Sequence, residues 1–263
     1  MRNQFYKYMP WVLGGLIGFF LFRPPAFLQD LGVLAWVIQL AMLALALLSF
    51  VMLMLLANLP QELKMTMLQD SQTPAEVEKV AREIEALGFH RVGPPWKVEI
   101  APVATLVGFV HESQPVYATA FCTGTAPSKV SFDFVSILDT EGAGLTTNNN
   151  AEGAVLPAGD ALFRQVFPGQ PADLLFRRHL EGVDWLSKHG QRCRAVSAGG
   201  FEEDFRKGVA RQREMFQAAP LTGTLVTLWR AATKQVPFVG ALGQQQIAGR
   251  QLSGQQAVRP IRV

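Results

Sequence analysis

The side chains best suited to covalent or acid–base chemistry are scarce, because the 263-residue chain holds two cysteines and four histidines. One pairing places Cys122 near His111, since the two residues fall on consecutive predicted strands. A thiol beside an imidazole is the arrangement of a cysteine hydrolase. Cys122 alternates with Ala118 and Ala120, however, a pattern typical of a small residue buried in a core. The buried interpretation is therefore favoured.

A second cluster of such groups lies near the end of the helix predicted for residues 171–189. His189 and Cys193 are four positions apart, and His179 lies on an earlier turn of the helix. No C-x-x-C motif accompanies them, so neither a zinc knuckle nor a redox dithiol is supported, and we expect no metal and no cofactor. The cysteines are predicted to be free thiols in the cytoplasm. A Cys122–Cys193 disulfide is the alternative outside it.

Sequence motifs for nucleotide binding and serine hydrolysis are missing, since the chain has no G-x-x-x-x-G-K-[ST], G-x-G-x-x-G or G-x-S-x-G. Asp133, a lone acid between two phenylalanines, is expected on the solvent side of its strand. An enzyme would need a site assembled from scattered residues, the candidates being His111, Cys122, Asp133 and His179. The sequence favours a non-catalytic role over an enzyme.

The elements that position these residues begin with two apolar segments. Residues 33–57 carry no charge, and a helix over residues 31–59 is long enough to cross a hydrocarbon core of about 30 Å. Before it, residues 9–22 are apolar and can extend to a short helix over 9–28. We predict a transmembrane helical hairpin, with residues 1–59 as a membrane anchor.

The orientation of the anchor follows from its flanking charges. In a hairpin, Arg2, Lys7 and Lys64 fall on one side, and the connecting loop holds Arg23 balanced by Asp30. The positive-inside tendency then predicts a protein of the inner membrane with two spans and a cytoplasmic soluble domain. The alternative is a single span with the domain in the periplasm.

Small and polar residues give both predicted membrane helices a face suited to close packing. Gly14 and Gly18 form a G-x-x-x-G pair, and an amide in lipid is best satisfied against protein. The predicted helix-packing residues are Gly14, Gly18, Ala35, Gln39, Met42, Ala46 and Ser49. The two faces either pack on each other within the hairpin or bind a transmembrane helix of a partner.

Residues 60–219 are predicted to form a soluble α+β domain. Thr73 to Glu76 read as a capping box that opens a helix ending at Gly88. Four β-rich runs with short connections, 103–111, 116–123, 129–138 and 144–147, indicate an antiparallel meander whose first strand is central. A Pro/Gly-rich loop over 153–169 and helices over 171–189 and 201–219 follow, so helices flank the meander.

The C-terminal segment, residues 220–263, is basic and partly amphipathic. Residues 60–204 hold 12 Lys and Arg against 19 Asp and Glu, a net −7, whereas residues 205–263 hold 9 against 1, a net +8. The predicted membrane-surface residues are Leu225, Leu228, Trp229, Arg230 and Lys234. The other interpretations are an ordinary domain helix and a docking surface for an acidic subunit. Nucleic acid is not expected as a partner, because the basic residues are dispersed.

These features predict a non-catalytic, membrane-anchored accessory or assembly subunit of a larger respiratory, photosynthetic or secretion complex. Its partners would be the lipid bilayer and other membrane protein subunits. The alternative is a membrane-tethered ligand-binding or sensory module with the meander as its pocket, and an enzyme with a scattered site comes third.

Overall fold

The chain divides into two compact units, residues 1–57 and 58–263. This computed structural model describes residues 33–58, 62–69, 73–99, 103–124, 126–150, 162–233 and 240–243. The predicted short helix over 9–28, with Gly14 and Gly18, lies outside the described residues, as does Lys234.

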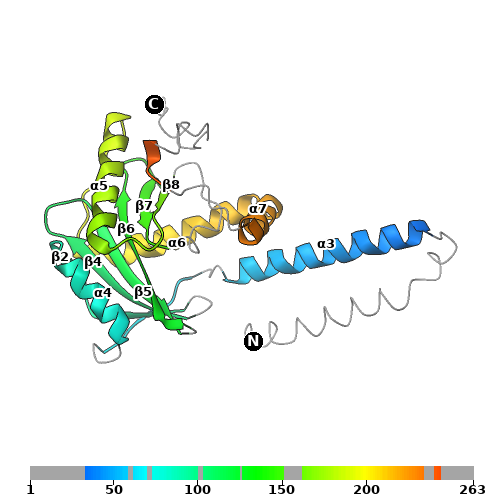
Figure 1. Cartoon of the computed structure of the whole chain (residues 1–263), viewed down its shortest axis with the longest axis horizontal. Helices are drawn as coiled ribbons and strands as arrows, with labels where there is room; N and C mark the ends of the chain where they lie inside the picture. Colours follow the sequence, from blue (N-terminus) through cyan, green and yellow to red (C-terminus); the bar gives the residue numbers. More distant parts are fainter. Residues whose placement is uncertain are drawn as a thin grey trace. The chain divides into compact units, whose positions relative to one another are not determined.

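The described part of the first unit is the helix α3 (Val33–Asn58) (Figure 1). It carries no charged residue, and among the described residues it is the one helix long and apolar enough to cross a membrane. Large apolar side chains such as Trp36 and Leu45 are more than half exposed along it. These features indicate association with a membrane.

The second unit is an α+β domain built on one mixed, mostly antiparallel sheet (Figure 1). Its described strands are β1 (Met65–Met67), β2 (Phe89–Arg91), β3 (Trp96–Val98), β4 (Ala104–His111), β5 (Tyr117–Thr123), β6 (Ala126–Ile137), β7 (Gly144–Asn148) and β8 (Leu162–Val166). They follow the order β1-β3-β4-β5-β6-β7-β8, with β2 also paired to β4. All pairs are antiparallel except β7 with β8.

The predicted meander is confirmed as β4 to β7, and β4 is central as expected. The sheet is larger than the sequence indicated. The predicted loop over 153–169 contains β8, which pairs in parallel with β7, so that prediction is wrong in part. Three strands of three residues each, β1 to β3, extend the opposite side. Strands this short show no alternation from which they could be predicted.

One face of the sheet is covered by α4 (Ala75–Glu85) and α5 (Ala172–Lys188), which enclose the largest apolar cluster. Val77, Ala81 and Ile84 of α4 are buried against it, as the helical spacing predicts. The predicted capping box is wrong, because Pro74 is the N-cap and no side chain caps the helix. The hydroxyl of Thr73 has no hydrogen-bond partner among the described residues.

The other face is covered in part by α6 (Phe201–Ala218), which follows a short 3-10 turn. Phe201 inserts its ring over Gly108 of β4, stacks on Trp96 at 5.5 Å and meets Tyr117 edge-on at 5.3 Å. A Cβ on Gly108 would lie 2.3 Å from the Phe201 ring. Glycine at this position therefore permits the close approach of α6 to the sheet.

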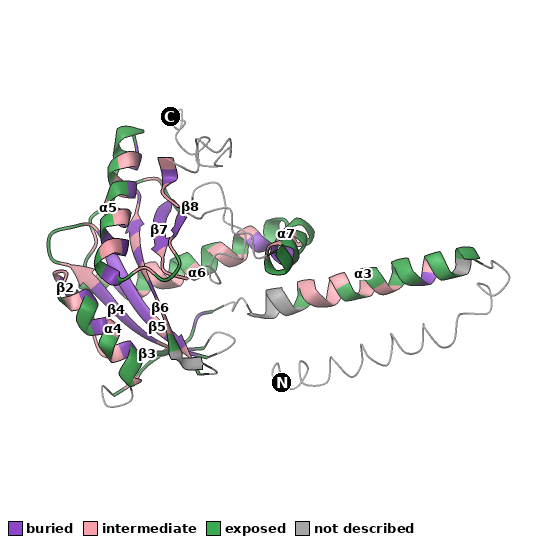
Figure 2. Cartoon of the chain, viewed as in Figure 1, coloured by how far each residue is buried: buried purple, intermediate pink, exposed green. Residues whose placement is uncertain are grey.

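The last described helix is α7 (Pro220–Thr233), which turns away from the line of α6 (Figure 1). The two helices meet where Gly223 approaches the ring of Phe216. A Cβ on Gly223 would lie 3.0 Å from Phe216 Cε2, which is a tight contact. Figure 2 shows that much of α7 is exposed, in contrast to the buried strands.

Candidate functional site

A buried chain of hydrogen bonds crosses the α5 side of the sheet. His179 of α5 has no exposed surface, and its Nδ1 and Nε2 each lie 2.9 Å from a hydroxyl, Thr147 Oγ1 and Ser136 Oγ. Gln165 Nε2 donates to Thr147 at 3.1 Å, and Ser136 donates to the Pro115 carbonyl at 3.1 Å. Because each hydroxyl has one proton, Thr147 donates to Nδ1, and the imidazole carries its proton on Nε2.

This Ser–His pair is built for structure and not for nucleophilic attack. Burial lowers the pKa of His179 to about 3, so the ring stays neutral. Ser136 and His179 are both fully buried, which leaves no approach for a substrate. Burial also raises the pKa of the nearby Cys193, which opposes thiolate formation.

The scattered residues considered for an enzyme are not brought together. Cys122 pairs with Thr105, whereas His111 lies six residues further along β4, about 20 Å away at the rise of a strand. Burial raises the pKa of Cys122 as well. Asp133 projects from the opposite face of the sheet to His179, since it alternates with the core residue Phe134.

Asp133 is not the solvent-side residue that the sequence predicted. It is half-buried and accepts a hydrogen bond from Thr119, its register partner on β5. Burial raises the pKa of this carboxyl group to about 6. Asn148 stands beside it on β7, and the Asn148 Oδ1 atom has no hydrogen-bond partner among the described residues. The three side chains form a polar row across β5, β6 and β7.

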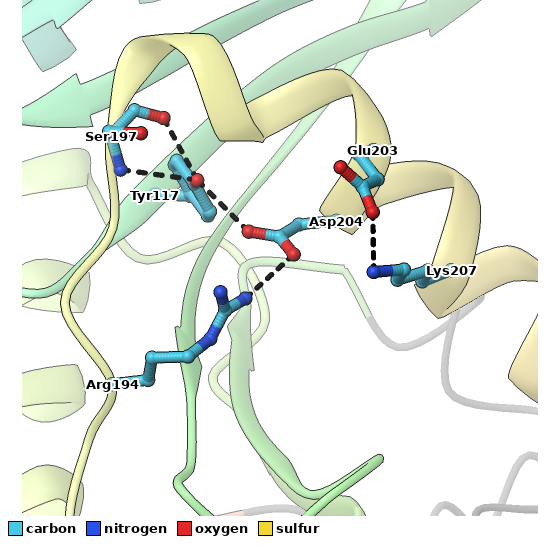
Figure 3. A network of polar contacts seen from close by, with 6 residues as sticks. All are labelled: Tyr117, Arg194, Ser197, Glu203, Asp204 and Lys207. Atoms are coloured by element: carbon cyan, nitrogen blue, oxygen red, sulfur yellow. Dashed lines mark hydrogen bonds and ion pairs between the residues drawn. The ribbon is translucent and has the colours of Figure 1, made fainter.

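A second network fastens α6 to the sheet (Figure 3). The Tyr117 hydroxyl lies 2.9 Å from the Ser197 carbonyl oxygen and 3.1 Å from Asp204 Oδ2. Arg194 donates to Asp204 Oδ1 at 2.6 Å. Burial raises the pKa of Tyr117 to about 12, so the phenol remains a donor at neutral pH. The nearby Glu203–Lys207 pair is exposed and lies along one helix face.

One shallow cleft opens beside α5, with a volume of about 260 Å³. Gln165, Gly182, Trp185 and Leu242 contribute to its lining, and the Gln165 amide is already bonded to the Leu242 backbone N–H at 3.1 Å. His189 lies outside the cleft lining, stacked on Trp185 at 3.9 Å, and its Nδ1 contacts the Trp185 carbonyl. The cleft is smaller than most small-molecule sites, which begin at about 300 Å³.

The predicted packing face of α3 differs in exposure along its length. Gln39 is 3% exposed, and its Nε2 has no hydrogen-bond partner among the described residues. Ala46 and Ser49 are half-buried, and Met42 is exposed. The side chain of Ala35 lies outside the described residues. The assignment of this face to a partner helix stays a prediction.

The predicted membrane-surface residues of α7 fall on two sides of the helix. Leu225, Leu228 and Trp229 are exposed, whereas Arg230 is half-buried. Burial lowers the pKa of Arg230. On β8, the pKa of Arg164 is lowered to about 10, mainly by burial and in part by the positive charge of Arg230. The exposed side of α7 is thus mainly apolar, and its assignment to a membrane surface stays a prediction.

No protein-family model matches the chain, and neither a curated protein nor a solved structure matches it significantly.

Two features of these sites were missed from the sequence. Gln165 belongs to the segment read as a loop, so its place beneath α5 was not foreseen. Gly182 lies within a helical run, and a Cβ there would meet Gln165 Nε2 at 2.5 Å. The only sequence signal for this close helix–sheet approach is a glycine inside a predicted helix, and that signal was not used.

Proposed function

We propose that this chain is a membrane-anchored, non-catalytic accessory or assembly subunit of a larger membrane protein complex. The observation that carries the proposal is that the buried and half-buried polar side chains best suited to catalysis are hydrogen-bonded within the domain. His179, Tyr117 and Asp204 are engaged in bonds that hold the domain together. Among the described residues, most of the exposed large apolar side chains lie on the helices α3 and α7, and such helix faces suit binding.

The partner subunits would bind α3 through its small and polar residues. An amide in hydrocarbon is stabilised when another helix supplies a hydroxyl or carbonyl group, and such bonds contribute about 1 kcal/mol. Gln39 is a candidate for such a bond, because its Nε2 lacks a hydrogen-bond partner among the described residues. Since Gln39 is 3% exposed, a partner helix would have to displace what covers it. Ala46 and Ser49, on the same side, would allow that helix to approach closely.

The proposed topology is a hairpin of two spans, residues 9–28 and 31–59, with the soluble domain in the cytoplasm of a cell with an inner membrane. Arg2, Lys7 and Lys64 on one side of the membrane support this orientation. A single span with a periplasmic domain is the competing topology. Reporter fusions at the two termini distinguish them, since the hairpin places both termini in the cytoplasm.

The first experiment is mild-detergent extraction from the native host, native electrophoresis and mass spectrometry of the co-migrating proteins. We expect a stoichiometric complex. The Gly14→Leu/Gly18→Leu double variant and Gln39→Leu should each release the chain from it, because both remove packing or hydrogen bonding between helices. Leu40→Ile, a change on an exposed position of α3, serves as the matched control and should leave the complex intact.

A lone monomer or homo-oligomer in the native gel would contradict the proposal. The second candidate, a membrane-tethered ligand-binding or sensory module, would then be favoured by the polar row of Thr119, Asp133 and Asn148. A carboxyl group, a hydroxyl and an amide on adjacent strands are groups that fix the orientation of a polar ligand.

A further inference from the structure

The helix α7 is amphipathic in the opposite sense to an ordinary surface helix. Its apolar side chains face outward, with Leu221, Leu225 and Trp229 each at least half exposed. Its inward side carries Thr224, which has no exposed surface, and Thr227, which is 7% exposed. Soluble helices normally bury the apolar stripe and expose the polar one. The outward face of α7 is thus suited to an apolar environment.

The inward side of α7 needs no water or polar partner. Thr224 Oγ1 donates to the Pro220 carbonyl and Thr227 Oγ1 to the Gly223 carbonyl, each at 2.7 Å. Because these hydroxyl groups are satisfied within the helix, threonine can pack inward while leucine and tryptophan face outward.

Charge identifies the occupant of the outward face. Helix α7 has no acidic residue, and from the start of α6 onward residues 201–263 hold 9 Lys and Arg against 4 Asp and Glu, a net +5, whereas residues 60–200 hold 12 against 16, a net −4. A negatively charged surface therefore attracts this end of the domain and repels the rest. Leucine and tryptophan beside arginine and lysine form the profile of a helix lying in an anionic membrane interface. An acidic protein would match the positive charge, but charge pairing alone does not account for the exposed leucine and tryptophan side chains.

We propose that the face of α7 formed by Leu221, Leu225, Leu228 and Trp229 lies in the headgroup region of an anionic bilayer and attaches the domain to it. This attachment does not depend on the subunit role, because lipid is its only partner.

The test places a spin label on α7 in the full-length protein. Cys122 and Cys193 are first replaced by alanine, and a labelled cysteine is introduced at Leu225. The protein is reconstituted into vesicles of phosphatidylcholine alone or with a third phosphatidylglycerol. Collision rates with a water-soluble nickel complex and with oxygen report whether the label lies in water or lipid. A label at Lys188, an exposed residue of α5, is the aqueous control.

In anionic vesicles we expect the nickel accessibility at Leu225 to fall at least about fivefold below that at Lys188, with oxygen accessibility raised. A Leu228→Glu/Trp229→Glu background should restore nickel access, whereas Thr222→Glu, on an exposed position beside the face, should not. Unaltered melting temperatures confirm that the variants fold.

Three results would overturn the proposal. The first is a label at Leu225 that is no less accessible than the label at Lys188 in either lipid. The second is equal protection of Leu225 in both lipids, which removes the role of anionic headgroups. Protection that depends on protein concentration in detergent would assign the face to a second copy of the chain. Because the vesicles contain no partner subunit, none of these results bears on the proposed complex, which the native gel tests separately.

Discussion

At the scale of single residues, the buried imidazole of His179 links four elements of the domain. Its two bonds to Ser136 and Thr147 tie α5 to β6 and β7, and Gln165 extends the chain to β8. Buried polar groups of this kind are costly unless every member is bonded. The chain of donors and acceptors runs in one direction, so a single histidine tautomer satisfies it.

The stability of the domain should therefore depend on pH through His179. In the unfolded chain this residue titrates near its ordinary pKa of 6.5, whereas in the folded chain its pKa is about 3. Its contribution is complete above pH 6.5 and is lost as pH falls, because the unfolded state takes up the proton first. His179→Phe should lower the unfolding free energy by about 2–3 kcal/mol at pH 7.5. Between pH 6.5 and 5 the variant should lose about 1.5 kcal/mol less unfolding free energy than the parent protein, because it has no imidazole to protonate. Denaturant titrations at each pH measure both effects.

Asp133 provides the opposite case for comparison. Its folded pKa of about 6 lies above the ordinary value of 3.8, so the folded state takes up the proton first and gains stability as pH falls through 6. Asp133→Asn should remove this gain and make the loss of stability on acidification steeper. If both variants retain the profile of the parent protein, neither group governs the pH dependence.

At the scale of elements, the position of α6 depends on one residue without a side chain. Gly108 leaves the space on β4 that the ring of Phe201 fills, and Phe201 in turn stacks on Trp96 and Phe205. The Tyr117–Asp204 bond fixes the same end of α6 from the polar side. Steric fit and hydrogen bonding thus act on the first turn of α6 together.

Gly108→Ala should displace the start of α6, because its Cβ would lie 2.3 Å from Phe201 Cζ. The expected loss is about 2–3 kcal/mol of unfolding free energy, the range for overpacking a core. Gly208→Ala is the matched control, since nothing lies within 4 Å of a Cβ on Gly208 in α6, and it should stabilise the protein by about 0.5–1 kcal/mol. Equal effects of the two variants would contradict the steric account. Chemical denaturation distinguishes them.

Sequence periodicity predicted the elements whose burial repeats along one segment. It located α5, α6 and the strands β4 to β7 within a few residues, because their apolar residues recur at helical or strand spacing. It missed β8, whose register is set by a parallel pairing with β7 across a loop rich in proline and glycine. It also placed Asp133 in solvent, because alternation predicts a face but not whether that face is covered. Under the interpretation of an ordinary domain helix, the apolar pattern of α7 predicted a buried apolar side, whereas Leu221, Leu225 and Trp229 are exposed and Thr224 is buried.

At the scale of the whole molecule, the apolar clusters formed by the described residues lie within residues 58–263. Leu63, two residues before β1, is buried in the second cluster. The Leu63 carbonyl oxygen accepts a hydrogen bond from Arg206 of α6. A unit with its own core can fold without the unit that precedes it in the chain.

A fragment of residues 58–263 should therefore melt cooperatively, within about 3 °C of the domain transition of the full-length protein in the same detergent. A fragment that begins at residue 73 is the informative comparison, because it lacks Leu63 and β1. The truncation removes the strand paired with β3, uncovers Trp96, and takes away the Leu63 carbonyl that accepts a hydrogen bond from Arg206. It should melt at least about 8 °C lower. Calorimetry of the three proteins measures both differences. A broad transition in the longer fragment would mean that residues 1–57 complete the core of the domain. Similar melting of the two fragments would mean that β1 contributes little to the sheet it borders.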